Sequence, residues 1–395
     1  MPASEVAPQT ALLLPPGVIE RPSPLDPVIL RDEFYSLTHK HGRVALHAAL
    51  DCPTAFINRL APGLTPNHLT SAAFLDIETT GLSGGEHAFA FLVGIGTFDN
   101  LAFRVRQYFL AQPFNEPAML AAVATTLERC NHVVTFNGTS FDLPRLSARF
   151  ALASLPNPLT ELRHIDLLVP ARRLYTHTLD SRRLTQIESR LMKLDRRADI
   201  DGSQSEARYA AYLQRRNLSG LPPLFEHNSF DVRFLPAFLG YLGRQWNRDA
   251  FDSAQLVALG RWAEEAGDPT QAISDYRQAI AIGHAGNGEA PARLTRLLEK
   301  QARWQECIPI WQVETHCPDL SCRVHALSQL ARLHERHMRP PAEALTLALE
   351  ARDLILQSTQ QRRFVRTLPA LEKRIARLQT KVLRPRSDAS GSHSL

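Results

Sequence analysis

The architecture of this chain follows from one short segment, Phe74-Leu-Asp-Ile-Glu-Thr-Thr-Gly-Leu82, in which two acidic residues interrupt an apolar run. Side chains alternate across a β-strand, so Asp76 and Glu78 would project from the same face. Two neighbouring carboxylates on an apolar strand are unfavourable unless a cation or a proton neutralises them. The segment therefore indicates a divalent-metal site, although an Asp-x-Glu pair by itself is also common on solvated strand edges.

Further strand and helix patterns follow this segment. After the first strand, strands are expected at residues 88–96, 102–109, 133–136 and 164–168, with helices over about 115–130 and from about 141. The run at 102–109 alternates apolar and polar side chains, which is typical of a half-buried strand. The order is βββαβαβ. It predicts an α/β domain whose mixed sheet begins with three sequential strands and continues through crossovers to parallel ones.

Acidic residues from two other segments complete a possible catalytic group. Asp142 follows an Asn-Gly turn at the start of an expected helix, and His227 and Asp231 stand one helical turn apart. Acidic residues from three segments together with a histidine are what two-metal phosphodiester hydrolysis requires. Carboxylate oxygens hold two Mg²⁺ or Mn²⁺ ions, and a histidine beside the attacking water can act as general base.

Three motifs carry a family resemblance. Residues 74–82, 134–142 and 227–231 resemble the three exonuclease motifs of the DEDD superfamily, and the βββαβαβ order resembles its ribonuclease H-like fold. Residues 163–175 and 226–231 are most similar to the YprB-type ribonuclease H-like domain family. The resemblance covers about residues 70–245.

The resemblance implies a role for each matching residue. The implied metal ligands are Asp76, Glu78, Asp142 and Asp231, and the implied general base is His227. One feature departs from the family pattern, because the histidine branch of the superfamily usually spaces His and Asp by five positions, whereas His227 and Asp231 are four apart. Asp166 could also reach the metals, but it is expected to hydrogen-bond to the helix that follows it, since four acidic ligands already suffice.

Residues beside the motifs are candidates for contact with nucleic acid. By the same resemblance, Thr79, Gly81 and Leu82 would line the cleft for the terminal nucleotide, and Asn137 is a further binding candidate. A turn that ends the strand explains Gly81 equally well, and Asn-Gly is a favourable turn. Eight basic residues would meet a phosphate backbone or form a solvated helix face: Arg172, Arg173, Arg182, Arg183, Arg190, Lys193, Arg196 and Arg197.

The rest of the chain suggests several further regions. The expected order is a flexible Pro-rich arm (1–28), an N-terminal extension (29–70), the nuclease domain (71–248), a helical domain (252–382) and a disordered tail (383–395). In the helical domain, the spacing of Ala272, Tyr276 and Ala279 is that of a tetratricopeptide repeat. It recurs 35 residues later from Cys307 and a further 37 residues on from Ala344. The match is loose, with Glu314 and Ala348 off-type, and an irregular helical bundle is the alternative.

The composition is that of an ordinary folded protein, with 395 residues, 44% hydrophobic residues and a net charge of +5. The five cysteines are odd in number and scattered, which excludes a secreted disulfide framework. No segment is apolar enough to span a bilayer, and we expect a cytoplasmic location. Cys317 and Cys322, with His316 and His325 nearby, have a poor spacing for zinc, so free thiols are expected there.

These patterns together predict a metal-dependent nuclease that removes nucleotides from the 3′ end of single-stranded nucleic acid. DNA and RNA are not distinguished, because groups that would read a 2′-hydroxyl are not visible in the motifs. Two alternatives remain open. One is a non-catalytic adaptor that binds a protein partner on its helical repeats, and the other is an endonuclease that uses the same site.

Overall fold

The computed structural model describes residues 15, 17–81, 88–196, 199–215, 218–246, 251–283, 288–337 and 341–383. Leu82, Arg197 and most of the expected arm and tail lie outside these residues. The chain divides into two compact units, Met1–Phe251 and Asp252–Leu395.

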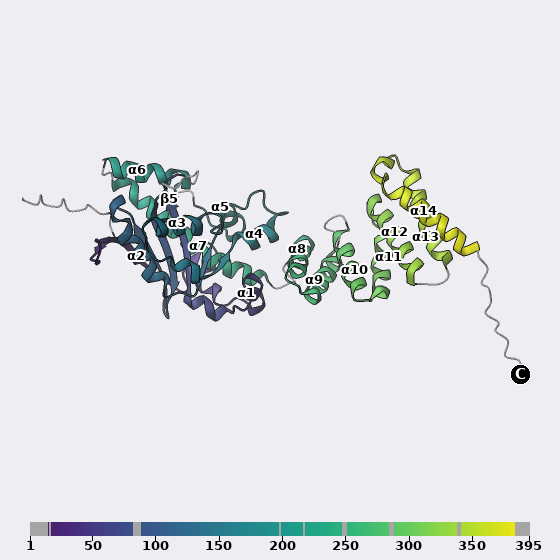
Figure 1. Cartoon of the computed structure of the whole chain (residues 1–395), viewed down its shortest axis with the longest axis horizontal. Helices are drawn as coiled ribbons and strands as arrows, with labels where there is room; N and C mark the ends of the chain where they lie inside the picture. The colour runs from purple at the N-terminus through teal and green to yellow at the C-terminus, as the bar shows by residue number, and fades with distance from the viewer. Residues whose placement is uncertain are drawn as a thin grey trace, which may run out of the picture. The chain divides into compact units, whose positions relative to one another are not determined.

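The first unit is built on a seven-stranded sheet of order β1-β2-β7-β6-β5-β8-β9 (Figure 1). The strands are β1 (Val18–Arg21), β2 (Val28–Ser36), β5 (Ala72–Thr79), β6 (Ala90–Phe98), β7 (Ala102–Phe109), β8 (His132–Thr135) and β9 (Arg163–Asp166). Strands β1, β2, β7, β6 and β5 are antiparallel neighbours, whereas β8 runs parallel to β5 and β9 runs parallel to β8. The predicted mixed sheet and the βββαβαβ order from β5 to β9 are therefore confirmed.

Helices and a small hairpin surround the sheet. The α-helices of this unit are α1 (Thr54–Leu60), α2 (Glu116–Leu127), α3 (Asp142–Leu152), α4 (Leu168–Tyr175), α5 (Leu184–Ile187), α6 (Ser205–Arg215) and α7 (Leu221–Gln245), and a π-helical turn, η5, covers Glu188–Met192. Strands β3 (Lys40–His41) and β4 (Val44–Ala45) form the separate hairpin. Helices α2 and α3 are the crossovers that the sequence predicts between β7, β8 and β9.

The N-terminal region belongs to the sheet, which the sequence did not predict. Strand β1 pairs with β2, and β2 pairs with β7 from Ile29 to Ser36. The expectations of a flexible arm through residue 28 and of a separate extension after it are therefore wrong for strands β1 and β2. The charged residues of β2 made its strand pattern hard to recognise in the sequence. Their partners lie on the neighbouring strand β7, where Arg104 Nε donates to Asp32 Oδ1 at 2.6 Å.

Two glycines of β6 let helix α7 lie directly against the sheet (Figure 1). A Cβ atom at Gly94 would lie 2.2 Å from Asn228 Oδ1, and one at Gly96 would lie 2.8 Å from Val232 Cγ1. Gly94 is the cross-strand partner of Asp76. Helix α7 therefore covers the face of the sheet that carries Asp76, while α2 and α3 pack on the apolar residues of the opposite face.

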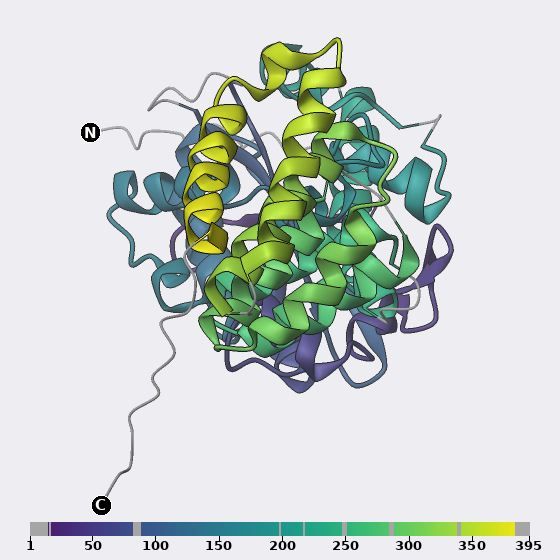
Figure 2. The same cartoon turned by 90° about the vertical axis from the view of Figure 1, so that its right-hand side faces the viewer.

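The second unit consists of helices in its described residues, and Figure 2 colours them from green to yellow. They are α8 (Ser253–Glu265), α9 (Pro269–Ile282), α10 (Glu289–Lys300), α11 (Cys307–Glu314), α12 (Leu320–His337), α13 (Pro341–Gln357) and α14 (Thr367–Leu383). Consecutive helices pack together. A Cβ atom at Gly260 would lie 2.4 Å from Tyr276 Cε1, so α8 and α9 approach closely. The unit is a helical domain, as predicted.

None of the described helices is long and apolar enough to cross a lipid bilayer.

Candidate active site

Strand β5 presents Asp76 and Glu78 on the face that helix α7 covers. Asn228 of α7 donates from Nδ2 to Asp76 Oδ2 at 2.8 Å and to the Asp76 carbonyl at 3.2 Å. Gln107 of β7, which is fully buried, donates from Nε2 to Asn228 Oδ1 at 2.8 Å and thereby orients this amide. The Asp76 carboxylate is thus held by a chain of hydrogen bonds that joins β7, α7 and β5.

Asp142 joins this group from the first turn of α3. Its Oδ1 accepts a hydrogen bond from the backbone N–H of Ile77, the residue between the two acids of β5, at 3.2 Å. The side chain is buried, with 4% exposure of the residue. The position that the sequence predicts, at a helix start beside the first strand, is confirmed.

His227 and Asp231 lie one turn apart on α7 and face the same group. Nε2 of His227 lies 3.6 Å from Glu78 Oε1 and 3.7 Å from Asp231 Oδ2. Nδ1 lies 2.9 Å from Asp199 Oδ2. The imidazole is therefore held at one nitrogen by Asp199 and directs the other nitrogen between two carboxylates. The structure thus brings together the five residues that the sequence predicts for catalysis.

Arg196 neutralises part of this acidic cluster. Nη1 donates to Asp231 Oδ1 at 2.5 Å and lies 3.1 Å from Asp199 Oδ2, while Nη2 donates to Glu188 Oε1 at 2.6 Å. His41 Nε2 binds the same Glu188 oxygen at 2.6 Å. The arginine side chain is only 6% exposed, so Arg196 does not belong to a solvated helix face, which was one of the two interpretations of the basic residues. Because Arg196 binds Oδ1 of Asp231, the other carboxylate oxygen, Oδ2, faces His227.

The carboxylates strongly affect one another's ionisation. Burial raises the pKa of Asp76 well above its ordinary value, and the neighbouring carboxylates of Asp231, Asp142 and Glu78 raise it further. Burial likewise raises the pKa of Glu78 to about 7 and the pKa of Asp142 to about 7. Without a counter-cation, these groups hold protons near neutral pH.

The pKa of His227 is also raised, but by its charged neighbours and against the effect of burial. Burial lowers its pKa, but the hydrogen bond to Asp199 and the charges of Asp231 and Glu78 outweigh that effect and raise the pKa to about 9. In return, the hydrogen bond and charge of His227 outweigh burial and hold the pKa of Asp199 below its ordinary value. Asp199 and His227 therefore behave as an ionised pair.

The donor set fits hard divalent cations. Four carboxylates from β5, α3 and α7 converge in a buried place where like charges repel one another, and their oxygens are the ligands that Mg²⁺ and Mn²⁺ prefer. The raised pKa values of Asp76, Glu78 and Asp142 indicate that bound cations would replace protons here. Asp76, Glu78, Asp142 and Asp231 are the residues that would hold them.

The predicted nucleotide-contact residues have structural partners of their own. Thr79 Oγ1 accepts from Arg145 Nη1 at 2.8 Å. Gly81 and Asn137 adopt left-handed backbone conformations, with φ of 82° and 69°, which is the geometry of turns. Leu82 lies outside the described residues, and contact of Thr79, Gly81 and Asn137 with a nucleotide stays a prediction.

Asp166 binds backbone, as the sequence predicts. Its carboxylate accepts from the N–H groups of Asn137 at 2.7 Å, Thr139 at 3.1 Å and Leu168, the first residue of α4, at 3.0 Å. The residue fixes the turn that precedes α3 and the start of α4.

Three residues of the site escaped the sequence interpretation. Asn228 stands inside the third motif, next to His227. Its side-chain amide can donate a hydrogen bond to a carboxylate, so the sequence did contain a sign of its role. Asp199 lies in an irregular segment with no periodicity, so nothing in the sequence marks it. Glu188 lies in the π-helical turn η5, and only the fold brings it to Arg196.

Comparison with known families agrees with this geometry. Residues 73–243 match the RNase H superfamily. Among curated proteins, the chain is similar to the uncharacterized protein YprB of Bacillus subtilis (strain 168), with 27% identity over 342 residues that cover 82% of each chain.

The matched region contains the whole acidic group, since it runs from β5 into α7. It begins after β1, β2 and the β3–β4 hairpin, although β2 pairs with β7 and His41 binds Glu188. The structural unit is therefore larger than the part that matches the superfamily.

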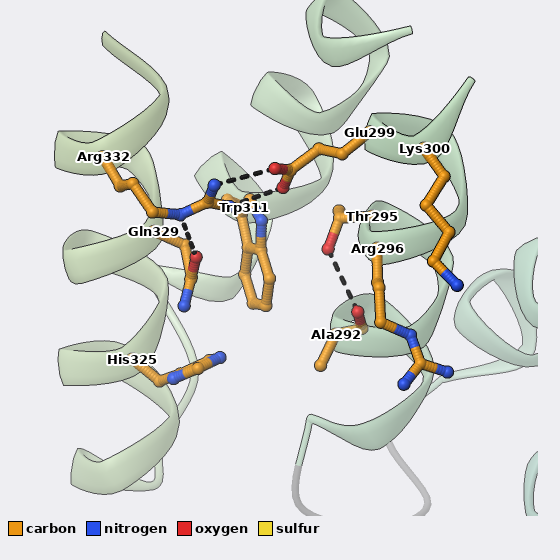
Figure 3. Close-up of a pocket in the computed structure, with 9 residues that line it drawn as sticks. All are labelled: Ala292, Thr295, Arg296, Glu299, Lys300, Trp311, His325, Gln329 and Arg332. Atoms are coloured by element: carbon orange, nitrogen blue, oxygen red, sulfur yellow. Dashed lines mark hydrogen bonds and ion pairs between the residues drawn. The ribbon is translucent and has the colours of Figure 1, made fainter. Parts of the chain in front are cut away.

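A second, separate pocket lies in the helical unit (Figure 3). It has a volume of about 510 Å³ and is lined by Ala292, Thr295, Arg296, Glu299, Lys300, Trp311, His325, Gln329 and Arg332. Arg332 Nη1 donates to Glu299 Oε2 at 2.7 Å. The buried indole N–H of Trp311 makes no hydrogen bond within the described residues. Figure 3 shows side chains of α10 facing side chains of α12, with Trp311 between the two helices.

Proposed function

We propose that this chain is a metal-dependent nuclease that hydrolyses phosphodiester bonds of single-stranded nucleic acid, acting from the 3′ end with two Mg²⁺ or Mn²⁺ ions. The observation that carries this proposal is the convergence of Asp76, Glu78, Asp142 and Asp231 on one buried place beside His227. The RNase H superfamily match supports hydrolysis of nucleic acid as the coarse activity. The 3′ polarity and the single-strand preference rest on the resemblance to the DEDD exonuclease motifs.

Each residue has a distinct part in the proposed reaction. Divalent cations bound by the four carboxylates would neutralise the phosphate and make water a better nucleophile. His227 would accept the proton of the attacking water at Nε2 in its neutral form, which bound cations would favour because they offset the charges of Asp231 and Glu78 that raise its pKa. Asp199 keeps the imidazole in this orientation through Nδ1. Asn228 and Arg196 keep the carboxylates of Asp76 and Asp231 in place.

The substrate would reach the site along the basic segment between β9 and α6. Arg172, Arg183, Arg190 and Lys193 are exposed there. A hollow of about 470 Å³, lined by Thr185, Ser189, Lys193, Leu194, Asp195 and Arg196, lies next to the acidic cluster because Arg196 belongs to both. Lysine and hydroxyl side chains are suited to contact with a phosphate backbone.

The test is Mn²⁺-dependent degradation of 5′- and 3′-labelled single-stranded DNA and RNA by the purified protein. A ladder that shortens from the 3′ end, and that disappears with chelator and in Asp76→Ala and Asp231→Ala, is the expected result. The preferred strand identifies the substrate class. Internal cleavage products that depend on the same residues would replace the exonuclease by an endonuclease.

A non-catalytic adaptor is the second candidate, and the pocket of Figure 3 is the feature that favours it. Arg296, Lys300 and the indole N–H of Trp311 are donors that suit an acidic peptide segment. Asp76→Ala separates the candidates, since an adaptor keeps its function in this variant and a nuclease loses turnover.

We also infer that the helices from α8 to α14 form tetratricopeptide-like repeats, because the recurring positions from Ala272, Cys307 and Ala344 are buried.

We place the protein in the cytoplasm, where free thiols persist. All five cysteines are free and buried.

A further inference from the structure

A second group of metal-ligating side chains lies in the helical unit, where α11 leads into α12. The carboxylate of Glu314 and the thiols of Cys317 and Cys322 place one ligand atom each within 4.8 Å of the other two. All three residues are buried, with exposures of 2%, 9% and 8%. This group shares no residue with the acidic cluster of the first unit.

The backbone brings these residues together. Glu314 ends α11, and the chain turns back at once, with the N–H of Cys317 donating to the Glu314 carbonyl at 3.1 Å. Asp319 accepts from the N–H of Cys322 at 2.9 Å and so starts α12 with Cys322 in its first turn. The three side chains therefore converge because of a hydrogen-bonded turn between two helices.

Glu314 is unusual at its position. In the recurring pattern of this unit, Ala279 and Ala351 hold the corresponding places, and both are fully buried small side chains. The Cys322 thiol donates to Glu314 Oε2 at 3.0 Å, so this carboxylate and this sulfur are in direct contact. The position thus combines a buried acid with two sulfurs instead of apolar packing.

We propose that Glu314, Cys317 and Cys322 bind a thiophilic divalent cation of the zinc class. Two sulfurs bonded to a tetrahedral zinc lie roughly 3.8 Å apart, which a cluster spanning 4.8 Å accommodates with small side-chain movements. Thiolate ligands select Zn²⁺ over Mg²⁺ and Mn²⁺, so this site and the carboxylate site take different metals. The bound ion would tie the end of α11 to the start of α12, with a fourth position left for water.

The histidines near these cysteines play no part. His316 Nδ1 lies 3.2 Å from the Gln312 carbonyl in an exposed position, and the ring of His325 packs against Trp311 at 5.2 Å between centroids. In the sequence, the spacing of the two cysteines is poor for a zinc site. The structure adds a third possible ligand, Glu314 at the end of α11, which the sequence spacing does not reveal.

Binding has a proton balance. Burial raises the pKa of the Cys322 thiol, and the neighbouring Glu314 and Cys317 raise it further. Each thiol therefore gives its proton to solvent as its sulfur–metal bond forms, and the affinity should increase with pH.

Cobalt titration of the reduced, full-length protein tests the proposal, because only sulfur ligands give a thiolate-to-Co²⁺ charge-transfer absorption. We expect one equivalent of Co²⁺ to produce this absorption and Zn²⁺ to abolish it by displacement. Cys317→Ser and Cys322→Ser should lose the absorption, and Glu314→Gln should weaken Co²⁺ binding at least tenfold. Circular dichroism checks that each variant remains helical.

Two matched controls accompany the titration. Cys307→Ser removes another buried thiol of the same unit, which donates to the Thr295 carbonyl, and it should keep the absorption. Asp76→Asn removes a ligand of the carboxylate site and should also keep the absorption. The cobalt absorption therefore tests the sulfur site whether or not the nuclease proposal holds. A reduced, folded wild-type protein without the absorption, or an absorption that survives both Cys317→Ser and Cys322→Ser, overturns the proposal.

Discussion

At the level of single residues, the site is a balance between acids that repel one another and three groups that hold them. Asn228 holds Asp76, Arg196 holds Asp231, and Asp199 holds His227. None of these three was predicted as part of the catalytic group. Arg196 and Asp199 act through contacts that only the fold creates, whereas Asn228 stands beside His227 in the third motif and could have been noticed. The acids themselves were predictable, since strand alternation and helical spacing decide which way Asp76, Glu78 and Asp231 project.

Asp199 should matter for turnover although it lies behind His227. We expect Asp199→Asn to lower kcat roughly 10–100-fold with little change in KM, because the imidazole loses its orienting carboxylate. The lost carboxylate also lowers the pKa of His227, so the acid limb of the pH–rate profile should move to lower pH. Steady-state kinetics over a pH series measures both effects.

Asp201 provides a matched control for this variant. It is an exposed aspartate two positions away, and its carboxylate accepts from the N–H of Ser203. Asp201→Asn should change kcat and the pH profile far less than Asp199→Asn, because its exposed charge acts on His227 only at a distance. An Asp199→Asn enzyme with wild-type kcat and an unmoved acid limb would contradict the positioning role.

The buried acids also predict how stability depends on pH. The pKa values of Glu78 and Asp142 rise to about 7 in the folded protein, so the folded state binds more protons than the unfolded state between about pH 4 and pH 7. The stability that these groups contribute is complete below about pH 4 and is lost as the pH rises through 7. His227, with a pKa raised to about 9, acts in the same direction.

We therefore expect the metal-free protein to lose on the order of a few kcal/mol between pH 5 and pH 8. Saturating Mn²⁺ should restore stability at pH 8. Asp76→Asn should be more stable than wild type at pH 8 in chelator, because it removes one buried charge. Urea unfolding at several pH values measures this, and a wild-type stability that increases from pH 5 to pH 8 in chelator would be the contrary result.

At the level of elements, the site depends on how closely α7 approaches the sheet. Gly94 and Gly96 have no side chains to hold α7 away from the sheet, and Gln107 of β7 can therefore reach Asn228 of α7. The sequence predicted strand β6. Nothing in the sequence indicates, however, that the glycines of this strand make room for a helix more than 120 residues later. Strand β2 was missed for a related reason, because its charged residues pair with Arg104 and other residues of β7.

Gly94→Ala tests this close approach. The added methyl group would lie 2.2 Å from Asn228 Oδ1 and 2.7 Å from Val232 Cγ2, so α7 must shift and Asn228 must release Asp76. We expect a loss of about 1–3 kcal/mol in the free energy of unfolding and a large loss of metal-dependent activity. Urea unfolding and the nuclease assay measure the two effects.

Gly220→Ala is the comparison, since its nearest neighbour, Arg208 Cβ, would lie 3.7 Å from the new methyl group, which is an ordinary contact. This variant should retain both stability and activity. If Gly94→Ala behaves like Gly220→Ala, the seating of α7 does not control the site.

At the level of the whole molecule, two units with separate cores carry two different chemistries. The first unit, Met1–Phe251, presents oxygen ligands, whereas the second, Asp252–Leu395, presents sulfur. The change from strand to helix patterns near residue 252 predicted the helical region. The sulfur cluster was not predictable, because Glu314 has a ligand role only once α11 and α12 are folded.

Thermal unfolding should reveal the two units as separate transitions. Mg²⁺, which prefers oxygen ligands, should raise the midpoint of one transition and leave the other unchanged. Asp231→Asn should abolish that shift. Differential scanning calorimetry measures it, and a single cooperative transition that Mg²⁺ moves as a whole would contradict independent units.

The place of β2 and of the β3–β4 hairpin has a practical consequence for anyone who trims the gene. A recombinant fragment that starts at residue 73, where the superfamily match begins, deletes the strand that shields β7 and the histidine that binds Glu188. An uncovered sheet edge invites aggregation, and Glu188 and Arg196 lose part of their anchoring. A protein prepared that way would be insoluble or inactive for reasons unrelated to its chemistry, so expression should begin upstream of Val18.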